Sequence, residues 1–130
     1  MSSKQVIYNV GIYLRLSKDD GDDVESESIT NQRKIINEYV TNSGNMNIYD
    51  EYIDDGYSGA NFNRPDFKRL LADIENKKIN MVITKNLARL GRNYIETGSY
   101  IEKYFPDHRV RYIAILAAMS RQNVEMISVL

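Results

Sequence analysis

A chain of 130 residues, 42% of them hydrophobic and 27% charged, is long enough for one domain with one core and no more. The absence of cysteine excludes disulfides, thiolate catalysis and cysteine-ligated metal sites, and with a single histidine it favours chemistry that needs no metal or other cofactor. The net charge of -1 argues against a basic surface over the whole chain, so affinity for nucleic acid would have to be local.

The first predicted element is a buried strand from Val6 to Leu16, rich in Val, Ile, Tyr and Leu. An acidic loop follows. Ser26 or Ser28 can then cap a helix that Ser43-Gly44 ends, and its apolar positions recur at helical spacing: Ile29, Ile35, Ile36, Tyr39 and Val40. A second strand is predicted from Ile48 to Ile53.

A turn-rich loop covers residues 54–61, and Pro65 stands at the first position of a second helix. The apolar face of this helix is Phe67, Leu70, Leu71 and Ile74. Two further strands are predicted, from Ile79 to Thr84 and from Val110 to Ile115. Between them we expect a helix over Tyr94 to Phe105, which Pro106 ends and which carries on one side Tyr94, Gly98, Ile101 and Phe105. Leu116 onward is predicted as a terminal helix.

Alternating strands and helices with short connections predict an α/β fold with three layers: a mostly parallel sheet of four to five strands with helices on both faces. Ligands of such sheets bind beyond the carboxyl ends of the strands. Ser17, Asp54 and the segment 85–92 each follow a strand, so we expect them to meet at one edge of a single domain over residues 1–130. No stretch is apolar for long enough to cross a bilayer, and we expect a cytoplasmic protein without a membrane partner.

The residues at this edge indicate phosphate chemistry. A serine hydroxyl is a poor nucleophile, but guanidinium groups that neutralise a phosphate can make its attack feasible. Arg15 stands two residues before Ser17, and Arg89-Leu90-Gly91-Arg92 is expected at the start of a helix. The spacing of Arg89 and Arg92 predicts that both lie on one helical face, beside a helix N-terminus that itself favours phosphate. What would take the proton from Ser17 stays open.

Four motifs in this order closely resemble the catalytic domain of the serine recombinases, in the version of large, transposon-type integrases and resolvases. They are Tyr13-x-Arg15-x-Ser17, Ser28-Ile29-x-x-Gln32, the segment 54–59 (Asp-Asp-Gly-Tyr-Ser-Gly) with Arg64-Pro65-Asp66-Phe67, and Arg89-Leu90-Gly91-Arg92-Asn93. The resemblance runs from about Val6 to Ile115 and implies a resolvase-like fold.

The resemblance implies that Ser17 attacks a DNA phosphodiester, giving a 5′-phosphoserine link and a free 3′ hydroxyl without ATP or metal. Subunits of a homodimer or homotetramer would then exchange strands on their recombination sites and religate them. The phosphate contacts implied by motif match are Arg15, Arg64, Arg89 and Arg92. Gln32 and Asp54 would support the pocket, and Tyr13 would line it.

The chain also departs from the family pattern. Ala88 stands where Asp or Ser is usual, and Asn86 stands where the transposon-type pattern has Asp, which implies reduced activity. The segment after Ile115 differs from the polar loop and long interface helix of the family. Recognition of DNA sites is therefore expected from other parts of the full-length protein.

Two other functions fit some of these residues. Asp19-Asp20, Asp54 and Thr84-Lys85 are the residue types of a magnesium-dependent phosphoacceptor receiver domain, which has the same kind of sheet. That hypothesis explains neither Arg15 and Ser17 nor Arg89-Leu90-Gly91-Arg92. Ala88 and the altered carboxyl end favour instead a non-catalytic dimerisation module on a recombinase scaffold.

Overall fold

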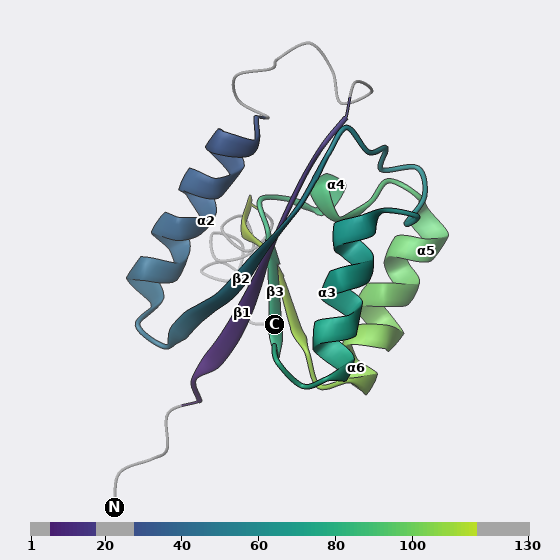
Figure 1. Cartoon of the computed structure of the whole chain (residues 1–130). Coiled ribbons are helices and arrows are strands. Elements are labelled where there is room, and N and C mark those ends of the chain that lie inside the picture. The colour runs from purple at the N-terminus through teal and green to yellow at the C-terminus, as the bar shows by residue number, and fades with distance from the viewer. Residues whose placement is uncertain (1–5, 18–27, 117–130) are drawn as a thin grey trace, which may run out of the picture.

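The computed structural model describes residues 6–17 and 28–116. Within them, one parallel sheet has the strand order β2-β1-β3-β4. The strands are β1 (Tyr8–Leu16), β2 (Met46–Asp55), β3 (Met81–Thr84) and β4 (Arg111–Ala114). Helices cover both faces of this sheet (Figure 1), which confirms the predicted α/β architecture of three layers.

Side chains of the central strand β1 alternate between the two faces, as the two-residue period of a strand requires. Val10, Ile12 and Leu14 belong to the core cluster on one face, together with Ile36 of the first helix. Tyr13 belongs to the cluster on the other face. Arg15 follows Tyr13 by two residues and therefore projects toward the same layer. The alternation thus brings an arginine to the end of an otherwise apolar strand.

Among the described residues, the helix that covers the first face is α2 (Ile29–Ser43). Its start confirms the predicted cap, since the Ser28 side chain accepts a hydrogen bond from Asn31 N at 3.0 Å. Gly44 ends it in the left-handed conformation with φ 79°, which favours glycine. Ile36 and Val40 are its buried apolar residues, on the face that the sequence predicts.

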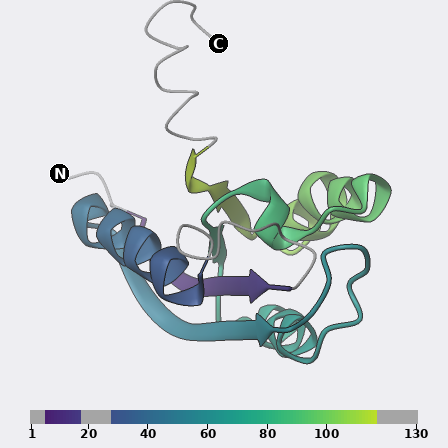
Figure 2. The same cartoon turned by 90° about the horizontal axis from the view of Figure 1, so that it is seen from above.

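The second face is covered by α3 (Pro65–Glu75), α5 (Tyr94–Ser99) and α6 (Phe105–Asp107), as Figures 1 and 2 show. A π-helical turn over Tyr100–Tyr104, η2, joins α5 to α6. The short helix α4 (Leu87–Leu90) follows β3. Buried residues of α3 and of the later helices pack in one cluster with Tyr13 and Tyr52.

The third long helix differs from its prediction at both ends. Tyr94 was expected on one side with Gly98, Ile101 and Phe105, but Tyr94 is 91% exposed whereas Phe105 is buried, and a π-helical turn lies between them. Pro106 was expected to end the helix, which instead continues through Asp107. The reason is the π turn: Phe105 N donates to Tyr100 O, five residues back, and this wider turn accommodates a residue that has no N–H to donate.

The acidic loop after Ser17 and the predicted helix beyond Leu116 lie outside the described residues. Within the described ranges, no helix combines the length and the apolar character that a membrane crossing requires.

Candidate active site

The carboxyl end of β1 pairs with β2 on one side and is held by side chains on the other. β3 pairs with β1 only over Val10 to Ile12, so this ladder ends before Arg15. Gln32 of α2 replaces it: its Nε2 donates to Arg15 O at 2.9 Å, and its Oε1 accepts from Arg15 N at 3.3 Å. Gln32 is fully buried. It thereby fixes the strand end that leads to Ser17.

The guanidinium group of Arg15 is fully buried and donates to three backbone carbonyls. Its Nε donates to Arg89 O at 3.1 Å, and one Nη donates to Ala88 O at 2.6 Å. The other Nη donates to Tyr57 O at 3.0 Å. Arg15 therefore ties β1 to α4 and to the β2–α3 loop (residues 56–64). The Ala88 contact uses a carbonyl, so the departure from the family pattern at this position leaves the contact intact.

Arg89 reaches the backbone that precedes Ser17. It is 2% exposed, and its Nη1 donates to Arg15 O at 2.9 Å. Asn86 helps to set this geometry, because its side chain accepts from Arg89 N and caps α4. Ser17, two residues after Arg15, is partly exposed at the same edge. This guanidinium group therefore lies beside the backbone that leads to Ser17.

The prediction that Arg89 and Arg92 share one helical face is wrong. The helix α4 ends at Leu90, and Gly91 continues in extended conformation with φ 178°. Arg92 follows outside any helix, with its side chain exposed, and its N donates to Gly59 O at 2.7 Å. A new helix, α5, starts only at Tyr94, where Asn93 caps it by accepting from Glu96 N. The two arginines therefore differ in burial: Arg89 lies inside and Arg92 at the surface.

Arg64 is the third buried arginine, 1% exposed, at the residue before α3. Its Nε donates to Ser58 O and Asn61 O of the β2–α3 loop, and its Nη1 donates to Leu90 O at 2.7 Å. The guanidinium carbon lies 4.4 Å from the centre of the Phe62 ring, a cation–π distance. Its Nη2 is buried and has no hydrogen-bond partner. The buried side chain of Arg64 thus fixes the backbone of the β2–α3 loop through its carbonyl groups.

Tyr13 connects Arg64 to Asp54. Its hydroxyl donates to Asp54 Oδ2 at 2.7 Å and accepts from Arg64 Nη1 at 3.0 Å. Burial raises the pKa of the Tyr13 phenol far above its usual range, although the nearby Arg64 opposes this shift. The phenol therefore stays protonated and keeps its donor for the carboxylate.

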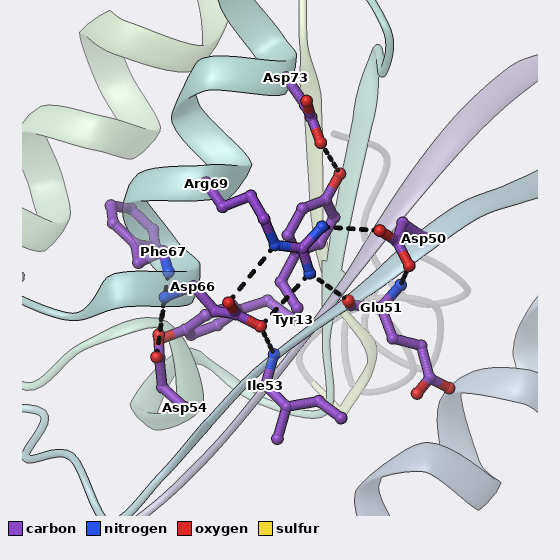
Figure 3. A network of polar contacts seen from close by, with 10 residues as sticks. Tyr13, Asp50, Glu51, Ile53, Asp54, Asp66, Phe67, Arg69 and Asp73 are labelled. Atoms are coloured by element: carbon purple, nitrogen blue, oxygen red, sulfur yellow. Dashed lines mark hydrogen bonds and ion pairs between the residues drawn. The ribbon is translucent and has the colours of Figure 1, made fainter.

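Asp54 caps α3 from a neighbouring strand (Figure 3). Its Oδ1 accepts from Asp66 N and its Oδ2 from Phe67 N, each at 2.9 Å. The residue is fully buried and lies within β2, opposite Arg15, rather than in the predicted loop after the strand. A carboxylate so enclosed is a poor phosphoacceptor, which disfavours the receiver-domain hypothesis.

The enclosure of Asp54 predicts a large loss of stability on Asp54→Asn. The amide keeps the shape but offers an N–H where the carboxylate accepts, so a buried donor is left unpaired and we expect a loss of roughly 3 kcal/mol. Asp73→Asn is the matched control, because Asp73 also accepts from a tyrosine, Tyr52 OH at 2.6 Å, but is only half-buried. That change should cost less than about 1 kcal/mol. Urea unfolding measures both, and equal losses would contradict the assignment.

The predicted residues other than Arg92 fall into two groups. Arg15, Gln32 and Arg89 meet around the backbone that leads to Ser17. Tyr13, Asp54 and Arg64 bond to one another at the start of α3. Lys85, which belongs to the segment expected at this edge, is buried, and its Nζ donates to Asn31 Oδ1 at 3.3 Å. Groups of three or more His, Cys, Asp or Glu that could hold a metal ion do not occur among the described residues.

Comparison with known families agrees with this fold. The family model described as "Resolvase, N terminal domain" matches residues 10–128. The chain therefore belongs to the resolvase N-terminal domain family. It is the catalytic domain of a site-specific DNA recombinase of the serine type, as its structural neighbours also indicate. No curated protein sequence matches it.

Solved structures of serine recombinases resemble the chain over most of its length. The N-terminal catalytic domain of TP901-1 integrase has 28% identity and a TM-score of 0.72, over 91% of this chain and 98% of that domain. The C-terminal catalytic domain of ISC1926 TnpA, an IS607-like serine recombinase, has 25% identity and a TM-score of 0.67, over 82% and 70%. A serine recombinase from Sulfolobus solfataricus has 26% identity and a TM-score of 0.61, over 81% and 66%.

Proposed function

We propose that Ser17 is the nucleophile with which this domain cuts DNA. Its Oγ forms a bond to phosphorus, the bond from phosphorus to the 3′ oxygen breaks, and the leaving oxygen gains a proton to replace the one that Ser17 loses. The product is a 5′-phosphoserine link and a free 3′ hydroxyl. The observation that carries the proposal is the 2.9 Å bond from Arg89 Nη1 to Arg15 O, which brings a buried guanidinium group beside the backbone leading to Ser17.

The four arginines have two different roles in this proposal. Arg92, exposed at the surface, and Arg89, at the serine, contact the scissile phosphate in this proposal. Arginine suits this task because its planar fork matches phosphate oxygens and stays charged at any working pH. Arg15 and Arg64 add positive charge from the interior and hold the carbonyl groups of α4 and the β2–α3 loop in place.

The domain also works as a homodimer or homotetramer on DNA recombination sites in this proposal. An apolar groove with a volume of about 550 Å³ lies beside Arg92 and is lined by Leu87, Tyr94 and Ile95. These three side chains are 47%, 91% and 82% exposed. Contiguous exposed apolar side chains are typical of an interaction surface, so we propose that a second copy of the chain packs there. Light scattering of the DNA complex measures the stoichiometry.

The test is a search for the covalent intermediate. The full-length protein is incubated with DNA that carries its recombination sites, denatured and digested with protease, and the phosphorylated peptide is identified by mass spectrometry. We expect the nucleotide on Ser17. DNA that is bound and paired but never linked would show a non-catalytic module, and labelling of Asp54 by acetyl phosphate with magnesium would show a receiver domain.

A further inference from the structure

Gly59, in the β2–α3 loop, is buried between two arginines of the site. A Cβ atom built on it would lie 2.7 Å from Nη2 and 3.0 Å from Cζ of Arg15. On the other side it would lie 3.0 Å from Cγ of Arg92. Real side chains do not approach a Cβ as closely as 2.7 Å, so any residue other than glycine must displace one arginine or both. The constraint is one of space alone.

The backbone of Gly59 also fixes the main chain of Arg92. Its carbonyl accepts from Arg92 N at 2.7 Å, so the residue that limits the Arg92 stem also anchors the Arg92 backbone. An exposed side chain outside any helix would otherwise have little to define its direction. Contact with Gly59 instead fixes where the Arg92 side chain begins to extend into solvent.

The loop cannot move away to relieve a larger residue. Tyr57 O, two residues before Gly59, accepts from Arg15, and Ser58 O accepts from Arg64 Nε. Asn61 O, two residues after it, also accepts from Arg64 Nε at 2.9 Å. Both arginines are buried, so these bonds hold the loop on either side of Gly59. A side chain at position 59 therefore acts on the arginines and not on the loop.

We propose that Gly59 is a positioning residue, which sets the direction of Arg92 and keeps it in register with Arg15 at the edge where Ser17 lies. This inference rests on the proposed function for its effect on DNA cleavage. Its structural content, the contact of Gly59 with the Arg15 guanidinium group and with the stem and backbone of Arg92, is independent of that function.

The experiment compares Gly59→Ala with Gly98→Ala. Gly98 lies in α5, and a Cβ there would meet nothing within 4 Å, so the same change costs no space. With the full-length protein at saturating DNA, Gly59→Ala should slow adduct formation about 10- to 100-fold, as small misplacements of a catalytic group do, while DNA affinity changes less than about twofold. Gly98 also lines the groove proposed for the second copy, so Gly98→Ala serves as the control for the arginine signals described next and not for the reaction rate.

Nuclear magnetic resonance of the arginine side chains supplies a readout that does not depend on activity. Gly59→Ala should shift the Nε–Hε signals of Arg15 and Arg92, and Gly98→Ala should leave both in place. Unshifted signals, or an unmodified reaction rate in Gly59→Ala, would overturn the proposal. If the reaction uses another nucleophile than Ser17, the proposed function fails while these shifts still report on Gly59.

The unmodified protein gives a second test, which holds even where Gly59→Ala does not fold. The bond from Arg92 N to Gly59 O predicts that the Arg92 amide exchanges its hydrogen slowly, although its side chain is exposed. Exchange as fast as that of an open loop would overturn the proposal.

Discussion

Ser17→Ala is expected to remove the covalent DNA adduct completely. No other group at the carboxyl end of β1 is proposed to attack phosphorus, and alanine has no oxygen with which to form the link. The side chain of Ser17 is partly exposed at the end of its strand, so the loss of one hydroxyl should change the free energy of unfolding by less than about 0.5 kcal/mol. A denaturing gel of protein with labelled DNA measures the adduct.

Ser58→Ala is the matched control for this change. Ser58 lies in the β2–α3 loop at the same edge, and its Oγ accepts a hydrogen bond from Ala60 N at 2.9 Å. Removing its hydroxyl should leave adduct formation intact, because this oxygen serves the local turn. An adduct that persists in Ser17→Ala and disappears in Ser58→Ala would show that Ser58 is the nucleophile and would contradict the assignment of Ser17.

Arg89→Ala and Arg92→Ala should both lose DNA cleavage but differ in stability. Each change removes a donor that we propose stabilises charge on the reacting phosphate, and such a donor is worth about 100- to 1,000-fold in rate. Arg89→Ala also removes the buried bond to Arg15 O and should lower the free energy of unfolding by about 1–3 kcal/mol. Arg92 is exposed, so Arg92→Ala should change the free energy of unfolding by less than about 0.5 kcal/mol. Single-turnover cleavage and urea unfolding separate the two effects.

Arg69→Ala controls for the loss of an arginine elsewhere. Arg69 of α3 bonds to Asp50, Asp66 and Glu51 O and lies over the Tyr52 ring, in the space between α3 and β2 (Figure 3). Its side chain is 42% exposed, so these ion pairs should contribute less than about 1 kcal/mol. Cleavage should continue at the unmodified rate. Equal loss of cleavage in Arg69→Ala and Arg92→Ala would contradict a local role for Arg92.

Residues with strong local signals predicted their elements well. Ser28 and Gly44 marked both ends of α2, and Pro65 with its apolar positions marked α3. The prediction that Arg89 and Arg92 share one helical face is wrong because it rests on the spacing of the arginines and overlooks the capping residues. Asn86 stands three positions before Arg89, and Asn93 stands three before Glu96. Two such caps indicate two helices, and this signal was present in the sequence.

The environment of the arginines could not be predicted in the same way. Arg15 and Arg64 are held mainly by backbone carbonyls, among them those of Ala88 and Leu90. Every residue has a carbonyl, so the sequence does not show which ones converge in space. The same reasoning applies to Gly59, whose missing side chain matters only because two arginines pass beside it. The motifs therefore indicated the chemistry of the site, whereas its burial depended on the fold.

Arg64 occupies the N-cap position of α3, where a short polar residue usually stands, and its own side chain makes no capping bond. Asp54 on the adjacent strand β2 caps the helix instead. Its carboxylate accepts hydrogen bonds from the first two amides of α3 and from the Tyr13 hydroxyl. The side chain of Arg64 is thereby left to bond with Tyr13 and with carbonyls of the loop. Because one carboxylate caps α3 and also binds the tyrosine that contacts Arg64, a change at Asp54 would disturb the start of the helix and a buried arginine together.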